Sequence, residues 1–145
     1  MFLGMSENAV DEKGRLTIPA RFRPLLEQGA YVTQGFDQNL MIMLSADFEA
    51  IYDRINQMSI TDPSIRQLRR FLFGRAEKLE IDRVGRILLP QALRNYAQLA
   101  QTAMVVGVGE HIEIWSLENW QRQDESLMDA EANAERFASL NLSGN

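Results

Sequence analysis

The sequence predicts an α+β fold, mainly β, in which two copies of one small unit follow each other along the chain. Three observations predict it. A thirteen-residue motif that begins at Asp11 returns seventy-one residues later, beginning at Asp82. Polar and apolar residues alternate after the glycine of the motif, which is typical of a strand. A proline then ends each strand and suits the first turn of a short helix.

The two copies of the motif share their chemistry position by position. The first copy carries Asp11, Gly14, Arg15, Pro19 and Arg23. The same residue types recur at the same offsets as Asp82, Gly85, Arg86, Pro90 and Arg94. Asp at the first and Gly at the fourth position predict a type I turn, because the carboxylate can accept backbone N–H groups and Gly takes the permissive dihedral. Each unit is therefore expected to contain a strand, a tight turn, a second strand and a helix.

An arginine follows the glycine of each turn. The alternation after the first turn predicts that Leu16 and Ile18 face a core, so that Arg15 points toward solvent. In the second copy Leu88 stands where the first has Thr17. This change predicts either burial on both faces of the strand or a contact between subunits.

The remaining elements can be placed in chain order. Strands before the turns are expected at residues 6–11 and 77–82, each pairing through its turn with the strand that follows. Short helices are expected at residues 19–28 and 90–100. Two further strands follow in each copy, at residues 30–33 and 40–44, and at 103–106 and 112–115. Ser45 and Ser116 are then interpreted as N-caps of helices at residues 47–57 and 118–127.

A linker joins the two units. Asp62 is expected to cap a helix over residues 63–73, with Pro63 at its first position. We therefore divide the chain into a first repeat at residues 1–60 and a second part at 61–145, which holds the linker helix, the second repeat and a helical tail. The tail is expected to be helical over 129–140 and frayed over 141–145. Units of about 60 residues are marginal alone, so the copies should pack together or complete each other's sheets across a subunit boundary.

Composition narrows the class of protein. The chain has 145 residues, 46% of them hydrophobic, and no cysteine, which excludes disulfides and thiolate metal sites. No secretory leader and no apolar run long enough to span a membrane are recognisable. We expect a cytoplasmic protein without a membrane partner. No metal site and no cofactor are predicted.

The charge is unevenly distributed along the chain. The net charge is −5, which by itself argues against binding nucleic acid. From residue 66 to residue 94, however, eight basic residues stand against three acidic ones, a local charge of +5. From residue 110 to the end, eight acidic residues stand against two arginines, a local charge of −6. This segregation suggests a basic working surface and an acidic remote one.

Two interpretations are open for Arg15 and Arg86. Each could be a surface residue, or one paired with the Asp four positions earlier. Duplication of the whole turn favours the other interpretation, in which each arginine contacts DNA. A strand pair that displays an arginine at a tight turn can enter the major groove, where the guanidinium makes bidentate bonds to guanine.

The remaining candidate residues are interpreted from their positions in the turns, helices and strands. Lys13 and Arg83 lie inside the turns and suit contacts with phosphate. Arg23 and Arg94 lie on the predicted helices, and we expect them to be structural partners of Asp or carbonyl groups. The single histidine, His111, lacks a nucleophile or a metal-binding neighbour, so an enzyme is disfavoured. Gly107 and Gly109 are interpreted as part of a hairpin turn, because no phosphate-binding helix follows.

The paired motifs resemble those of the MraZ family, bacterial transcription factors. The resemblance lies in residues 11–15 with Pro19 and Arg23, in residues 82–86 with Pro90 and Arg94, and in the segments 1–4 and 71–76. It implies a mainly-β tandem AbrB/SpoVT-like barrel of the double-psi, swapped-hairpin type, with short helices and a pseudo-two-fold internal repeat. The turn-forming residues would be Asp11, Gly14, Asp82 and Gly85.

The resemblance also implies a function. The family members bind double-stranded DNA at short direct repeats upstream of the division and cell-wall gene cluster, which includes their own gene. They assemble into homo-oligomeric rings and act mainly as repressors, in the cytoplasm and on the nucleoid. By position, Arg15 and Arg86 would contact DNA. A second interpretation is an AbrB-type antitoxin, a DNA-binding protein whose tail neutralises a protein partner.

Overall fold

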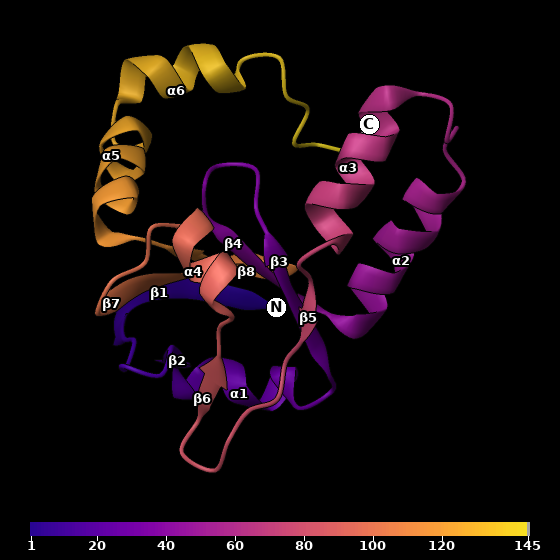
Figure 1. Ribbon diagram of the computed structural model, residues 1–145. Helices are drawn as coiled ribbons and strands as arrows, with labels where there is room; N and C mark the ends of the chain where they lie inside the picture. The colour runs from indigo at the N-terminus through magenta and orange to yellow at the C-terminus, as the bar shows by residue number, and fades with distance from the viewer. Residues whose placement is uncertain (145) are drawn as a thin grey trace.

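The computed structural model describes residues 1–144, which form two antiparallel sheets and a set of short helices (Figure 1). The strands are β1 (Phe2–Ala9), β2 (Arg15–Thr17), β3 (Ala30–Gln34), β4 (Leu40–Leu44), β5 (Glu77–Lys78), β6 (Arg86–Leu88), β7 (Thr102–Gly109) and β8 (His111–Trp115). The helices are η1 (Ala20–Phe22, 3-10), α1 (Arg23–Leu26), α2 (Ser45–Asn56), α3 (Pro63–Phe73), α4 (Gln91–Tyr96), α5 (Leu117–Leu127) and α6 (Ala130–Phe137). The predicted α+β class is confirmed.

The large sheet is shared by the two copies. Its strand order is β1-β7-β8-β4-β3-β5. β1 from the first copy pairs along its whole length with β7 from the second, and β5 from the second copy pairs with β3 from the first. β4 and β8 join the copies at the centre. Each copy thus completes the sheet of the other within one chain, which confirms that the two units pack together.

The small sheet consists of β2 and β6, one strand from each copy. Leu16 lies opposite Ile87 at its centre, and both side chains are fully buried. The core below them repeats the same positions of the motif from both copies, namely Leu16, Ile18 and Phe22 with Ile87, Leu89 and Leu93. Burial of equivalent positions in one core explains why the apolar pattern of the motif is the same in both copies.

The sheets are not closed into a barrel within residues 1–144. The large sheet ends at β1 and β5, and β2, β6 and α1 lie below it in the view of Figure 1. The strands β2 and β6 are three residues long and are followed closely by Pro19 and Pro90. Because proline cannot donate to a ladder, the small sheet stops there.

The hairpins predicted at the two turns are wrong. The strand before the first turn is β1, which pairs with β7, and only Val10 bridges to Leu16. In the second copy only Ile81 bridges to Ile87. β1 pairs with β7 and not with β2 because β7 is the longer partner strand. β7 pairs with all eight residues of β1, whereas β2 has three.

Two of the predicted helices are shorter than expected. The helix predicted at 19–28 is divided into η1 and α1, because Pro24 has no N–H to continue the hydrogen-bond pattern. The helix predicted at 90–100 ends at Tyr96, two residues before Gln98 takes the left-handed dihedral φ of 57°. Ser45 is the first residue of α2 rather than its cap, so that prediction is wrong.

Other local predictions are confirmed. The Ser116 Oγ accepts the N–H of Asn119 at 3.0 Å and caps α5. α3 spans the predicted residues, and Oδ1 of its cap Asp62 accepts the N–H of Ser64 at 2.8 Å. The tail is helical over a shorter stretch than predicted, as α6. Part of the segment predicted to fray, residue 145, lies outside the described residues.

Candidate nucleic-acid interface

The first Asp-x-x-Gly segment folds into a tight turn that positions Arg15. The carboxylate oxygen Oδ1 of Asp11 accepts the N–H groups of Lys13 at 3.0 Å and Arg15 at 2.9 Å. The N–H of Gly14 donates to the Asp11 carbonyl at 2.9 Å, and Gly14 has a φ of 82°. The second oxygen, Oδ2, accepts Nε of Arg15 at 2.7 Å. One carboxylate therefore holds both the turn and the arginine that follows it.

The second turn repeats this geometry. Oδ1 of Asp82 accepts the N–H groups of Val84 at 3.0 Å and Arg86 at 2.9 Å, and Oδ2 accepts Nε of Arg86 at 2.8 Å. The N–H of Gly85 donates to the Asp82 carbonyl at 3.1 Å, at a φ of 86°. The same bonds in two separate turns show that the geometry belongs to the motif and not to one local environment.

These bonds stabilise the ionised carboxylates. The backbone N–H of Arg15 has the largest effect in lowering the pKa of Asp11, and the Arg15 guanidinium lowers it further. The pKa of Asp82 is lowered in the same way, first by the backbone N–H of Arg86 and then by its side chain. Both carboxylates therefore remain charged partners of their arginines well below neutral pH.

Arg15 and Arg86 fold back onto their aspartates and do not extend freely into solvent. Their side chains are 33% and 31% exposed. Within residues 1–144, Nε of each makes the hydrogen bond to Asp, and the terminal nitrogens of Arg15 make none. A guanidinium has five N–H donors, so the terminal nitrogens can still form a bidentate pair with an outside acceptor. The aspartate bond fixes the direction in which they point.

The two turns lie next to each other, which the sequence did not indicate. Nη1 of Arg86 is 3.7 Å from Oδ2 of Asp11 in the other copy. Arg15 and Arg86 also line one hollow of about 370 Å³, together with Glu80, Ile81, Asp82 and Leu88. Both arginines can therefore approach one ligand surface.

Two exposed apolar residues, Leu88 in the same hollow and Val84 at the second turn, were not predicted to contact a ligand. Leu88 is 60% exposed and lies opposite Arg15 in the β2–β6 pair, so burial on both faces is excluded within this chain. Val84, at the second turn, is 58% exposed. Exposed apolar side chains next to the arginines can contact a thymine methyl group. The replacement of Thr17 by Leu88 between the copies was the signal that could have identified this position.

Arg23 and Arg94 have the structural role that was predicted, and their partners are backbone carbonyls rather than aspartates. Nε of Arg23 donates to the Ile18 carbonyl, and Nε of Arg94 to the Leu89 carbonyl, both at 2.9 Å. Each guanidinium also lies against the turn glycine of the other copy. The two arginines are therefore half-buried and support the turns.

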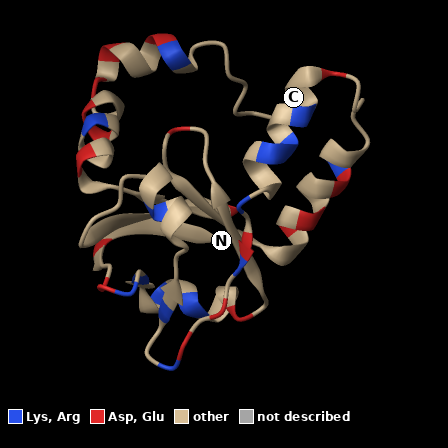
Figure 2. Ribbon diagram, in the orientation of Figure 1, with Lys and Arg blue, Asp and Glu red and all other residues tan. Residues whose placement is uncertain are grey.

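The basic residues do not gather on one surface, as the charge along the sequence had suggested. Lys and Arg gather near β2, β6 and α1 at the bottom of Figure 2, where Lys13 and Arg83 are exposed, and again along α3 on the far side of the large sheet. Arg66 and Arg69 on α3 donate to carbonyls at the end of α2 and in the connection that follows it. The run of basic residues in the sequence is thus divided between two places.

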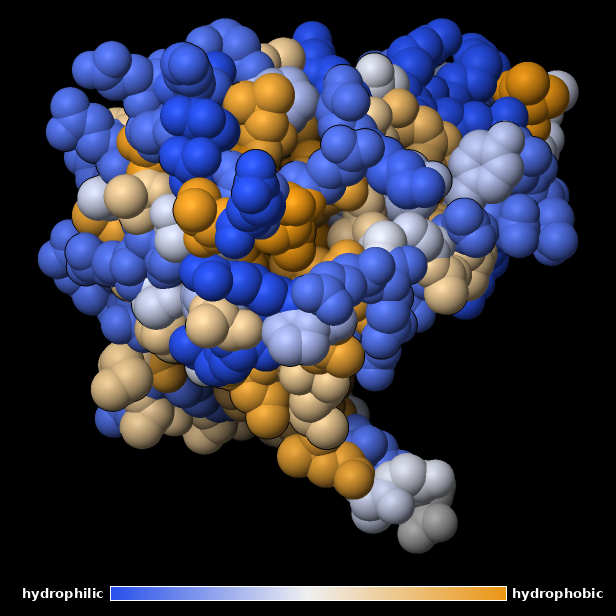
Figure 3. All heavy atoms as spheres, turned by 90° about the horizontal axis from the view of Figure 1, so that it is seen from below, coloured by the Kyte–Doolittle hydropathy of each residue, from blue (hydrophilic) through white to orange (hydrophobic). Residues whose placement is uncertain are grey.

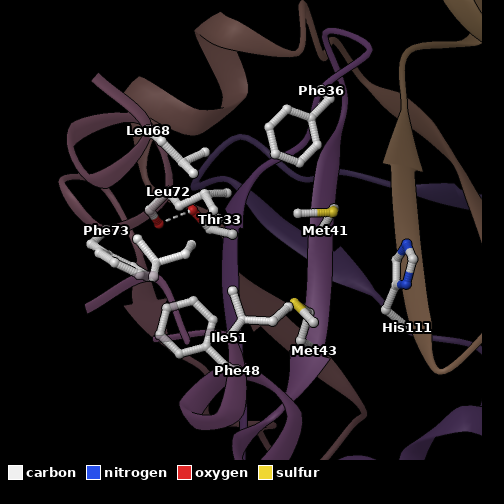
Figure 4. Close-up of a pocket in the computed structure, with 11 residues that line it drawn as sticks. Thr33, Phe36, Met41, Met43, Phe48, Ile51, Leu68, Leu72, Phe73 and His111 are labelled. Carbon is white, nitrogen blue, oxygen red and sulfur yellow. Dashed lines mark hydrogen bonds between the residues drawn. The ribbon is translucent and has the colours of Figure 1, made fainter. Parts of the chain in front are cut away.

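The other candidates do not form a catalytic site. His111 begins β8, and its Nε2 lies 3.6 Å from Glu113 Oε2. Gly107 lies within β7 rather than in a hairpin turn, which is a correction. Met41 and Met43 line an apolar cavity of about 320 Å³ between the sheet and the α2–α3 pair (Figure 4). In residues 1–144 no cluster of three metal-binding side chains occurs, and no helix is long and apolar enough to cross a membrane.

The fold and the paired turns define a class: proteins built from two interleaved copies of one swapped strand unit, each with an Asp-x-x-x-Arg turn. The family model described as "MraZ protein, putative antitoxin-like" matches this chain twice, over residues 1–71 and 72–141. The chain therefore belongs to the MraZ family.

Curated relatives agree with this membership. A protein of Herpetosiphon aurantiacus named "Transcriptional regulator MraZ" is 47% identical over 98% of this chain and 100% of the relative. Proteins of the same name from Thermomicrobium roseum and Roseiflexus castenholzii are each 44% identical, over 97% and 95% of this chain and 99% and 94% of the relatives. These names describe regulators and not enzymes, in agreement with the prediction that the chain is not an enzyme.

Proposed function

We propose that this protein is a transcriptional regulator that binds double-stranded DNA in a sequence-specific manner through its two Asp-x-x-x-Arg turns. The observation that carries the proposal is the paired geometry of Arg15 and Arg86. Each arginine is held by its aspartate through Nε, and the two lie on one hollow. The names of the curated relatives support the regulatory role.

The proposed contacts follow from donor geometry. The terminal nitrogens of Arg15 and Arg86 would bond O6 and N7 of guanine in the major groove. Lys13 and Arg83 are exposed at the tips of the same turns and would contact phosphates. Asp11 would orient Arg15 before DNA arrives, which lowers the entropy lost on binding.

The assembly and the target belong to the same proposal and rest on the family resemblance. Several copies of the chain would form a homo-oligomeric ring, so that neighbouring subunits read short direct repeats. Linked copies raise the effective concentration of each turn, and modest contacts then add up to useful affinity. The protein would repress the division and cell-wall gene cluster, including its own gene, in the cytoplasm and on the nucleoid.

The experiment is a binding titration of the purified protein against its own upstream region and against a scrambled duplex, at two salt concentrations. We expect a preference for the native duplex that weakens with salt and is lost in Arg86→Ala. The variant Arg54→Ala, with a change at an exposed position on α2 away from the turns, is the matched control and should bind as the wild type does. Equal weak binding to both duplexes would contradict sequence-specific recognition.

A second candidate function is an AbrB-type antitoxin activity. The acidic segment α5–α6, which is largely exposed, favours it as a surface for a protein partner. Co-purification of a small basic protein in fixed proportion, lost when the acidic residues of α6 are replaced, would support this function.

A further inference from the structure

α6 has no packing partner that could explain its stability. Among the described residues, α6 buries no side chain. It is held to the end of α5 by polar contacts, in which Nδ2 of Asn133 donates to the Leu127 carbonyl at 2.7 Å and Nη2 of Arg136 donates to Ser126 Oγ at 3.0 Å. A helix of two turns gains little stability alone in water and normally persists by burying an apolar face. The apolar side chains at its end are therefore free to contact another molecule.

The α5–α6 arm, defined as residues 117–142, has apolar residues to bury. Met128, Phe137, Leu140 and Leu142 are 79%, 48%, 59% and 96% exposed. Figure 3 shows the C-terminal end of the chain standing out from the body, with apolar surface next to it. Over residues 117–142 the sequence has six acidic and two basic residues. The arm thus combines an apolar tip with a negative charge.

A groove beside α3 has the complementary character. A hollow of about 500 Å³ is lined by Phe36, Ser64, Gln67, Leu68, Phe71 and Tyr96. We call it the α3 groove. Residues 63–75 carry four arginines and no acidic residue. Within residues 1–144, Arg70 bonds only to Gln67, at 2.7 Å, and Arg75 has no polar partner. Arg70, through its bond to the lining residue Gln67, therefore places positive charge without a counter-ion beside the hollow, and Arg75 follows at the end of α3.

The arm does not reach the groove of its own chain. α5 packs on β7, whereas α3 packs on β3, and β8 and β4 lie between these two strands in the sheet. In Figure 1, α5 and α6 lie on the side of the molecule away from α3; the segment after α6 runs in the direction of α3, but Figure 3 shows its end standing out from the body. The complementary partner of each surface is therefore on another molecule.

We propose that the α5–α6 arm of one copy docks in the α3 groove of a second copy. Phe137 at the end of α6, with Leu140 and Leu142 after it, covers the hollow, and Glu131 and Glu135 face Arg70 and Arg75. Opposite charges select this orientation and disfavour arm-to-arm contacts. The inference rests on the homo-oligomer of the proposed function and specifies its interface. The two surfaces differ, so the contact is head-to-tail and forms a closed ring when the rotation between subunits closes.

The test uses charge reversals on each surface of the full chain. Arg70→Glu with Arg75→Glu alters the groove, and Glu131→Arg with Glu135→Arg alters the arm. Glu27→Arg with Glu49→Arg is the control, because it changes the charge by the same amount as the arm variant at exposed positions elsewhere. Light scattering during size-exclusion chromatography gives the mass of each, and far-ultraviolet circular dichroism checks folding.

A head-to-tail contact makes a specific prediction for mixtures. The groove variant and the arm variant should each have the mass of one chain, while the control keeps the wild-type mass. Mixed in equal amounts, the two variants should recover the wild-type mass, because the intact arm of one meets the intact groove of the other, and the reversed arm meets the reversed groove. A chain that carries all four reversals should assemble again, since the exchanged charges attract each other.

The results separate this inference from the proposed function. If the wild type assembles and both variants keep its mass, or if the fourfold variant stays a single chain, the docking is overturned while DNA binding stands on its own titration. If the wild type is a single chain at every concentration, both the docking and the proposed ring are overturned. Recovery of the wild-type mass in the mixture together with reassembly of the fourfold variant supports the docking.

Discussion

The guanidinium group of Arg94 lies directly over Gly14, in the turn of the other copy. A β-carbon at Gly14 would stand 2.5 Å from Cζ of Arg94. Arg94 is held there because its Nε donates to the Leu89 carbonyl at 2.9 Å, while the N–H of Leu89 donates to the Gly14 carbonyl at 2.9 Å. Each copy therefore supports the DNA-facing turn that we assign to the other.

The close approach makes both turn glycines sensitive to substitution. We expect Gly14→Ala to lower the free energy of unfolding by about 2–4 kcal/mol, from the left-handed dihedral and from displacement of Arg94. Gly85→Ala should behave alike, because Arg23 lies against it. Urea denaturation measures the change. Gly109→Ala is the control, because Gly109 has a φ of 99° but no heavy atom within 4 Å in the described structure. Equal losses at all three positions would contradict the support by the arginines.

Replacing the proposed base-reading arginines by lysine tests donor geometry at constant charge. Lysine keeps the positive charge but cannot bond Asp and a guanine at the same time in a fixed plane. We expect Arg15→Lys or Arg86→Lys to reduce the preference for the native duplex by about 1–3 kcal/mol. Competition binding with both duplexes measures it. Binding to the scrambled duplex should change little, and an unchanged preference would argue against base contacts by these side chains.

The turn residues Lys13 and Arg83, which we assign to phosphate contacts, should affect the affinity for any duplex and not the preference for the native one. Their removal as Lys13→Ala or Arg83→Ala should weaken binding to the native and scrambled duplexes by the same factor. The slope of log K against log salt should become smaller in magnitude by about 0.9 for each phosphate that the variant no longer neutralises. Titrations at four salt concentrations measure both quantities. A variant that alters the preference but keeps the slope would reassign its residue to base contact.

The lowered pKa values of Asp11 and Asp82 predict an acid-sensitive stability. A carboxylate whose pKa is lower in the folded than in the unfolded state stabilises the fold above its unfolded pKa, and this stabilisation is lost as the pH falls through the folded value. We expect the free energy of unfolding to fall below a pH of about 4. In Asp82→Asn the fall should be shallower, as urea denaturation between pH 2 and 7 would show.

Glu113 also makes the stability depend on pH, and it does so equally in the wild type and in Asp82→Asn. Burial raises the pKa of Glu113, but the neighbouring His111 and the hydrogen bond from Trp115 lower it by more, so it adds to the fall in both proteins. The difference between wild type and Asp82→Asn therefore isolates the turn. Parallel curves for the two proteins would show that the turn carboxylate does not contribute.

One buried hydroxyl forms a hydrogen bond between the sheet and α3. Thr33 is fully buried, and its Oγ1 donates to the Leu72 carbonyl at 2.5 Å (Figure 4). Thr33→Val keeps the shape and removes the donor, so we expect a loss of about 1–2 kcal/mol in unfolding free energy. Thermal unfolding checks it against Thr61→Val, an exposed control. Equal small losses would show that the hydroxyl adds nothing.

Local hydrogen bonding is the part of the fold and site that could be predicted. Asp62, Pro63 and the apolar stripe of α3 lie within one helix, so the helix and its cap followed from neighbouring residues. The strands β3, β4 and β8 were also close to their predicted positions. The predicted hairpins failed because a strand alone does not indicate which partner offers it the longest ladder.

In the site, too, the contacts between residues close in sequence were predictable, and those between distant residues were not. The bonds from Asp11 to Arg15 span four residues, so the sequence contains everything needed to form them. The approach of Arg86 to Asp11 and the contact of Arg94 with Gly14 join residues more than seventy positions apart. Burial of Leu16 and Ile87 in one core brings those residues together, because that core removes the apolar side of both copies from water at once, and backbone bonds such as that from Leu89 to Gly14 then align the copies.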